Sequence, residues 1–152
     1  MTEIHLKTII MAPIEKVFDL NRNINIHLLS TSQSDEKVIA GRTSGLIELG
    51  ETVTWKAKHF GVYLTHKSII TAMDFPIHFV DEMAEGQFKS FWHEHSFEVK
   101  DGTTIMTDKI QYETPFGLFG SLFDRIILKK YLTKFISRRN RLLKNLAEEN
   151  QE

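Results

Sequence analysis

The hydrophobic pattern of this chain changes period at Pro115, and that change limits the folds it can adopt. Before Pro115, apolar and polar residues mostly alternate, which is typical of strands with one buried face. After Pro115, apolar residues recur at steps of three and four with charges between them, which predicts one long amphipathic helix over about residues 118–148. Since neither a one-faced sheet nor a one-sided helix buries its apolar surface alone, we expect the helix to lie across the sheet.

The segments before Pro115 predict one strand, two short helices and then about six antiparallel strands. The first strand, over residues 4–11, stops at Ala12-Pro13, and proline suits the first turn of a helix. The later segments are a short helix over 14–20, a short helix or turn over 22–29, extended chain over 31–74, and strands over 77–84, 88–99 and 103–112. The predicted fold class is therefore α+β, a curved antiparallel sheet wrapped around one long C-terminal helix.

The composition is that of one folded domain. A length of 152 residues fits a single domain over residues 1–152, and 41% hydrophobic with 26% charged residues is ordinary for such a domain. The chain has no Cys, which excludes disulfides, thiol catalysis and cysteine metal sites. No apolar run approaches the ~18 residues of a membrane span, and the first ten residues lack the pattern of a secretory signal. We therefore expect a cytoplasmic protein.

Basic residues gather on the predicted C-terminal helix, although the net charge is only -1. Residues 124–144 hold eight Lys or Arg and a single acid. This stripe is either a solvated helix face or a binding surface for anionic lipid, an anionic ligand or nucleic acid. We expect no nucleic-acid partner because no nucleic-acid motif accompanies the stripe. Peripheral contact with an anionic membrane through this helix stays open as a hypothesis.

The dipeptide Asp101-Gly102, between two alternating segments, predicts a two-residue hairpin turn. Lys100 would then pair with Thr103, and His95 would lie directly opposite Asp108. One face of this hairpin would carry Phe91, His93, His95, Phe97, Val99, Met106, Asp108, Ile110 and Tyr112. Because the other face is mostly polar, we expect this set to line the concave side of the sheet.

A second hairpin is predicted around Gly61-Val62, with glycine in the first central position. Phe60 would pair with Tyr63 and lie on the outer face. The concave face would then receive Val53, Trp55, Ala57, His59, Leu64, His66 and Ile70. The parity of the strand over 77–84 stays open, since either Phe79, Asp81 and Met83 or His78, Val80 and Glu82 could point inward.

Four histidines and one aspartate would thus share the interior, and buried groups of this kind need partners or water. In one interpretation, His95 and Asp108, with His93 as a further candidate, form an acid/base set. In a second, His93 and His95 are metal ligands with Asp108 or His66 as a third. In a third, they anchor a ligand or satisfy one another. His-x-His alone is a weak metal signal, so we expect no metal and no cofactor.

Several segments resemble a known superfamily. They are residues 9–20 (IIMAPIEKVFDL), 45–55 (GLIELGETVTW), 79–82 (FVDE), 86–89 (GQFK) and 92–97 (WHEHSF). Together with the order of elements, they are similar to the START-like superfamily, also called SRPBCC, and to an uncharacterised bacterial subgroup of it. The resemblance implies a helix-grip fold with a deep apolar cavity that opens near the first helices. It carries no catalytic residues over, because this scaffold hosts carriers, enzymes and regulators.

The expected function is binding of a hydrophobic or amphipathic small molecule, lipid-like or aromatic, as a carrier or sensor. The alternative is a cyclase, dehydratase or hydrolase that uses the pair His95–Asp108. The expected ligand contacts are Trp55, His59, His66, Phe91, His93, His95, Phe97, Met106, Asp108, Tyr112, Phe119 and Phe123. We expect a monomer or a homodimer.

Overall fold

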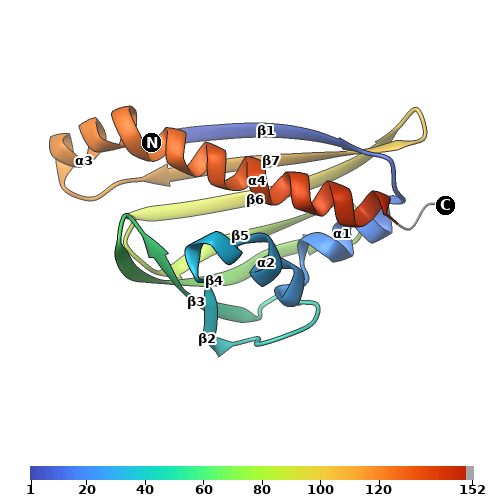
Figure 1. Ribbon diagram of the computed structural model, residues 1–152, viewed down its shortest axis with the longest axis horizontal. Helices are drawn as coiled ribbons and strands as arrows, with labels where there is room; N and C mark the ends of the chain where they lie inside the picture. Colours follow the sequence, from blue (N-terminus) through green and yellow to red (C-terminus); the bar gives the residue numbers. More distant parts are fainter. Residues whose placement is uncertain (150–152) are drawn as a thin grey trace.

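The computed structural model describes residues 1–149 and has the predicted α+β architecture (Figure 1). Seven antiparallel strands form one sheet in the order β1-β7-β6-β5-β4-β3-β2. The elements in chain order are β1 (Thr2–Ile10), α1 (Ile14–Asn21), α2 (Ile24–Ser30), η1 (Ser32–Ser34), β2 (Lys37–Gly41), β3 (Thr52–His59), β4 (Val62–Asp74), β5 (His78–Glu85), β6 (Ser90–Lys100), β7 (Thr103–Glu113), α3 (Gly117–Phe123), η2 (Asp124–Leu128) and α4 (Lys129–Glu148).

The long C-terminal helix is confirmed, and it is continuous over 32 residues. The segments α3, η2 and α4 follow one another without a break, and η2 is one stretch of π-helix between two α-helical parts. In Figure 1, α4 lies across the sheet above α1 and α2, while α3 projects at the opposite end of the molecule from the C-terminus. No described helix is both long and apolar enough to cross a membrane.

Local sequence explains the two short helices between β1 and β2. Pro13 precedes the first residue of α1, and the side chain of Asn23 caps α2 by accepting hydrogen bonds from the backbone amides of Asn25 (2.9 Å) and Ile26 (3.2 Å). The core then forms two clusters. One packs Phe18 of α1 against Phe79 and Phe97, and the other packs Tyr112 with residues of the C-terminal helix.

The hairpin of β6 and β7 has the predicted register, with Lys100 opposite Thr103 and His95 opposite Asp108. Asp101 and Gly102 both have positive φ, +52° and +76°, as a tight hairpin turn of this kind requires. The Asp-Gly signal was therefore sufficient to place the face of both strands.

The predicted register of the hairpin of β3 and β4 is wrong by two residues. The turn lies at Phe60-Gly61, with φ +50° and +76°, so that His59 pairs with Val62 and Trp55 with His66. A slip of two residues keeps every side chain on its face, because the side-chain period of a strand is two. The correction also moves Phe60 from the outer face to the turn, where its ring lies 4.6 Å from that of Tyr131.

Candidate functional site

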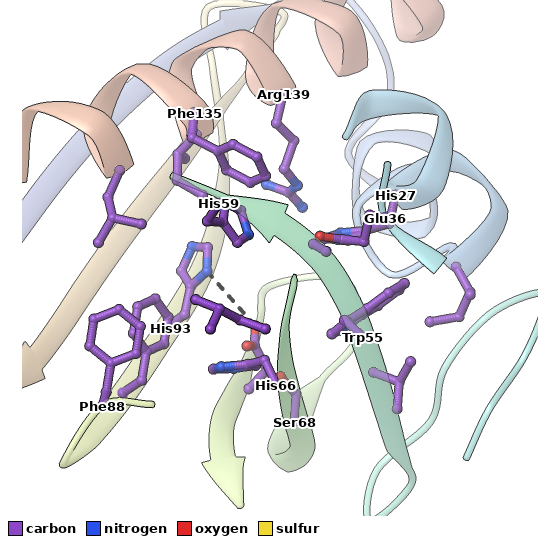
Figure 2. A pocket seen from close by; sticks show the side chains of 18 of the residues that line it. His27, Glu36, Trp55, His59, His66, Ser68, Phe88, His93, Phe135 and Arg139 are labelled. Carbon is purple, nitrogen blue, oxygen red and sulfur yellow. Dashed lines mark hydrogen bonds and ion pairs between the residues drawn. The ribbon is translucent and has the colours of Figure 1, made fainter. Parts of the chain in front are cut away.

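A cavity of about 250 Å³ lies between the concave face of the sheet and the C-terminal helix. Strands β3 to β6 supply its floor, and α2 and α4 close its sides. Figure 2 shows Trp55, His59, His66 and His93 reaching into it from the strands, with Phe135 and Arg139 reaching down from α4. Most of the lining is apolar. Its charged and titratable groups include Glu36, which lies 2.5 Å from Nε2 of His27 near α2, and a largely buried cluster on β5 and β6.

That cluster consists of Asp81, His93 and His95, and the open parity of β5 is settled in favour of Phe79 and Asp81 pointing inward. Nε2 of His95 lies 2.9 Å from Oδ2 of Asp81, and Nε2 of His93 lies 2.8 Å from Oδ1 of Asp108. The two imidazole rings lie 3.8 Å apart between their centroids. The predicted pair of His95 and Asp108 is therefore one part of a network of two histidines and two aspartates.

Asp108 forms the base of this network and does not line the cavity. It is fully buried, and its Oδ2 accepts a hydrogen bond of 2.6 Å from Nδ2 of Asn140 on α4. Nη1 of Arg139 lies 3.7 Å from Oδ1 of Asp108, and Nη2 of Arg139 donates to Oδ1 of Asn21 at 3.0 Å. Helix α4 thus supplies a charge and an amide that hold Asp108 in place, which in turn orients His93.

The electrostatics of the network separate the two histidines. Burial and the neighbouring charge of His95 lower the pKa of His93, even though Asp108 and Asp81 favour its protonated form. Burial also opposes protonation of His95, but its contacts with Asp108 and Asp81 outweigh that cost and raise its pKa. The structure therefore favours a neutral His93 and a positively charged His95.

Both carboxylates of the network are held ionised. Burial works against ionisation of Asp81, but the hydrogen bond from His95 and the neighbouring imidazoles of His93 and His95 lower its pKa to about 2. The pKa of Asp108 lies well below its ordinary value, since burial is outweighed by the hydrogen bond from His93 and by the nearby imidazole of His95. Ionised Asp81 faces the cavity, so the cluster presents a negative group beside the unprotonated Nδ1 of His93.

On the opposite wall, no carboxylate among the described residues forms an ion pair with His59 or His66, although the charges of Asp81 and Glu36 favour protonation of His66. Nδ1 of His59 lies 2.6 Å from the hydroxyl of Tyr131, and His66 lies edge-on to Phe91 with centroids 5.5 Å apart. Burial lowers the pKa of both His59 and His66, which keeps them neutral. This wall is apolar in character despite its two imidazoles.

The donor set of the polar cluster also suits a divalent transition metal. One carboxylate oxygen of Asp81 and one ring nitrogen each of His93 and His95 lie within 4.8 Å of one another. Two imidazoles and a carboxylate are a common set for such ions, and Asp108 behind His93 is the kind of partner that fixes a ligating imidazole. Among the described residues, Asp81, His93 and His95 are thus the ones that could hold a metal. The sequence indicates Asp108 or His66 as the third ligand, whereas the structure puts Asp81 in that place.

Six of the expected ligand contacts line the cavity. They are Trp55, His59, His66, Phe91, His93 and His95. Three others, Phe97, Met106 and Tyr112, are buried in the core behind it. The expected contacts Phe119 and Phe123 on α3 do not line the cavity and are 86% and 41% exposed. Contact with a ligand stays a prediction for all of them.

Sequence reasoning missed the support from α4. Arg139 was counted with the basic stripe, yet it is only 4% exposed, and Asn140 beside it is 3% exposed. Both lie between the buried positions Ile136 and Leu143, at three- and four-residue steps from them. That spacing within the apolar stripe was the available signal, since a polar pair at such positions needs a buried partner.

Comparison with solved structures agrees with the architecture. The protein TTHA0849 from Thermus thermophilus superposes with a TM-score of 0.80 at 18% identity, over 99% of this chain and 100% of that one. A START superfamily protein from Mycobacterium smegmatis gives 0.72 at 10% identity, over 97% of both chains. The chain has the START-like helix-grip fold.

A plant protein has the same fold. Ginseng major latex-like protein 151 from Panax ginseng superposes with a TM-score of 0.69 at 17% identity, over 96% of this chain and 97% of that one. No protein-family model and no curated protein sequence matches the chain. The START-like resemblance of the sequence is thus confirmed as a fold, and at these identities the likeness says nothing about function.

Proposed function

We propose that the protein binds a small amphipathic molecule, with its apolar body in the cavity and its polar end against Asp81 and His93. The observation that carries this proposal is an apolar cavity with a cluster of Asp81, His93 and His95 in its wall, which Asp108, Asn140 and Arg139 support from behind. Such an arrangement of few, well-held polar groups in an apolar pocket is typical of small-molecule sites.

The protonation states indicate what the polar end of the ligand must be. Since Nε2 of His93 is bonded to Asp108, a neutral His93 presents an unprotonated Nδ1, and Asp81 presents an ionised carboxylate. Both groups accept hydrogen bonds, so the ligand should donate one, as a hydroxyl, a phenol or an amine does. At about 250 Å³, the cavity lies below the ~300–1,000 Å³ of drug-sized sites, which favours a ring or a short chain over a long acyl chain.

The experiment compares two probes that differ in one donor, 2-naphthol and 2-methoxynaphthalene. We expect 2-naphthol to bind about tenfold more tightly, because the buried acceptors would stay unpaired against the ether. Asp81→Ala should remove that preference while leaving the binding of the ether, and Glu98→Ala on the exposed face should leave it intact. Equal affinities of the wild-type protein for the two probes would contradict the proposal. Native mass spectrometry of the purified protein would then look for a co-purified molecule.

A second candidate function is acid/base catalysis in the same cavity. The contact of 2.9 Å between His95 and Asp81 favours it, because an imidazole held by a carboxylate at a cavity wall is a competent proton carrier. The acid/base pair of this candidate is His95 with Asp81, in place of the predicted His95 with Asp108. Nε2 of His95 lies 2.9 Å from Asp81, whereas its Nδ1 lies 3.4 Å from Asp108.

The test for catalysis follows deuterium exchange at the α-carbons of 2-tetralone by NMR in heavy water. A working acid/base set, with charged His95 as the acid to the carbonyl oxygen and neutral His93 as the base, should accelerate the exchange at least ~100-fold over His95→Gln, in the presence of a chelator so that no metal contributes. If His95→Gln exchanges as fast as the wild-type protein, the cluster is a binding site without base catalysis.

A further inference from the structure

The N-terminal end of the C-terminal helix exposes an unusual number of large apolar side chains. Leu118 is 88% exposed and Phe119 is 86% exposed, values far from those of a helix packed on a core. We define the apolar tip as the exposed residues Phe116, Leu118, Phe119, Leu122, Phe123, Ile126 and Ile127. Soluble domains rarely leave such a contiguous set in water, and sets of this size mark interaction surfaces.

The backbone holds the apolar tip outward. Gly120 is the one buried residue of α3, and a Cβ at this position would lie 1.7 Å from the carbonyl oxygen of Pro115. Only glycine allows this close approach, so α3 is fixed with Gly120 against the preceding turn. Helix α3 projects at the end of the molecule (Figure 1), and Leu118, Phe119, Leu122 and Phe123 on it are exposed.

The exposed surface around the apolar tip is cationic. Arg125, Lys129, Lys130 and Lys134 are exposed. Between residues 114 and 147 the sequence has one acid, Asp124, which is 5% exposed and accepts hydrogen bonds from the hydroxyls of Tyr112 and Thr2. No negative charge of this stretch therefore offsets the lysines and the arginine at the surface.

The hairpin of β3 and β4 extends the same surface. The rings of Phe60 and Phe123 lie 5.7 Å apart, and Val62 and Tyr63 beside the turn are also exposed. Lys56 and Lys58 approach the ring of Tyr63. Both elements thus combine exposed apolar side chains with lysines.

The cavity reaches the surface close to this hairpin. Its exposed lining residues are Phe60, Thr65 and Gln87, whereas its lining residues on α1 and α2 are buried or half-buried. The cavity therefore has an opening beside Phe60, whose ring contacts Phe123 of the apolar tip, and we call this opening the mouth.

We propose that the apolar tip and the hairpin of β3 and β4 dock on an anionic lipid bilayer. The apolar side chains enter the interface between headgroups and acyl chains, and the flanking lysines and Arg125 contact the lipid phosphates. The cavity mouth then faces the bilayer, so that a ligand passes between membrane and cavity without crossing water. This last step rests on the proposed function, whereas the docking itself does not.

A bilayer fits the tip better than a second copy of the chain. A symmetric dimer through the tip would bring Arg125, Lys129 and Lys130 of one copy beside the same residues of the other. Like charges in an interface oppose association, whereas an anionic membrane offers them phosphate and offers the phenylalanines an apolar layer.

Vesicle binding of the full chain tests the proposal. The probe is phosphatidylcholine vesicles with about a quarter phosphatidylglycerol, compared with pure phosphatidylcholine. We expect co-sedimentation with the anionic vesicles, weakened at least ~tenfold by Leu118→Asp with Phe119→Asp. The charge reversals Lys129→Glu and Lys130→Glu should each weaken binding roughly fivefold or more, an effect that fades as salt rises to about 0.5 M.

The controls change exposed apolar residues elsewhere on the surface. Leu49→Asp with Ile39→Asp removes two apolar side chains that are 58% and 53% exposed and lie outside the tip, and binding should persist. The proposal would be overturned if vesicle binding were the same for the wild-type protein and the tip variant, and the same with and without phosphatidylglycerol. A second result would also overturn it. The wild-type protein would sediment as a dimer and not bind vesicles, and Leu118→Asp with Phe119→Asp would convert the dimer to a monomer. Because the assay needs no cavity ligand, its failure leaves the 2-naphthol experiment unaffected.

Discussion

The two hairpins that form the cavity stabilise their histidines in opposite ways. On β6 and β7, His93 and His95 lie against Asp108 and Asp81, and a second layer from α4 completes the network. On β3 and β4, His59 and His66 lie among aromatic rings. One wall is thus a preorganised charged site, and the other is a packing surface that contains imidazoles. We therefore expect the β6–β7 wall to recognise the polar group of a ligand and the β3–β4 wall to recognise the shape of its apolar part.

The largest expected effect comes from removing Asp108. Asp108→Ala leaves Arg139 buried without its carboxylate and leaves Asn140 and His93 without their acceptor. Loss of one partner of a buried charge pair costs about 3–5 kcal/mol, which urea unfolding will measure. Glu98→Ala on the exposed face of β6 is the control and should change stability by less than about 0.5 kcal/mol. A loss as small as that of the control would show that the network does not hold the wall.

Asp81→Asn should produce an intermediate effect that depends on pH. A pKa of about 2 in the folded state, against an ordinary 3.8, corresponds to about 2 kcal/mol of stabilisation at pH 7. The folded-state pKa is the lower one, so this contribution is present above pH 3.8 and is lost as the pH falls towards about 2. Wild-type and variant should therefore differ at pH 7 and converge near pH 2 in denaturant titrations.

The same variant tests the contrast between the histidines. Without the Asp81 carboxylate, the pKa of His95 should fall, because one of the two groups that stabilise its charge is gone. The pKa of His59, which does not depend on the charge of Asp81, should move much less, and that of His66 should fall slightly, which NMR titration of the ring protons will show. If all of them shift equally, the two walls are not electrostatically separate.

Filling the apolar wall should affect ligand binding more than stability. Ala57 lies on β3, is 3% exposed and lines the cavity, so the ring of Ala57→Phe would occupy the space of the proposed ligand. We expect 2-naphthol to bind about tenfold more weakly, with a change in stability below about 1.5 kcal/mol because the cavity accommodates the ring. Ala84→Phe, exposed on β5, is the matched control. Unchanged affinity in Ala57→Phe would place the ligand elsewhere.

The same two hairpins explain how far sequence reasoning reached. The β6–β7 face was predictable because Asp-Gly is a strong turn signal and fixes every pair in both strands. The β3–β4 register was not, because the turn puts Phe60 at φ +50°, a conformation that phenylalanine rarely adopts and that tertiary contacts to Phe123 and Tyr131 favour here. The side chains of β3 and β4 were still assigned to the correct faces of the sheet, since the register was wrong by an even number of residues.

The centre of the site was predictable only in part. His93, His95 and Asp108 follow from local pairing, whereas the place of Asp81 depends on the strand after the irregular pairing between Ile70 and Ala72, where the register shifts. Arg139 and Asn140 depend on how α4 rotates over the sheet. Contacts between elements far apart in the sequence determine the position of Asp81 and the rotation of α4. No spacing of residues along the chain encodes these contacts directly.

The smallest effect compares the two turns themselves. Gly61 and Gly102 both have φ +76°, and a Cβ at either position would meet nothing within 4 Å. Gly61→Ala and Gly102→Ala should therefore each cost about 1 kcal/mol through backbone conformation alone. The binding of 2-naphthol should tell them apart, because Gly61 adjoins the lining residue Phe60 while Gly102 lies at the other end of the sheet. A loss of stability in Gly102→Ala alone would mean that the β3–β4 turn does not hold Gly61 in the left-handed conformation, and the corrected register would then be wrong.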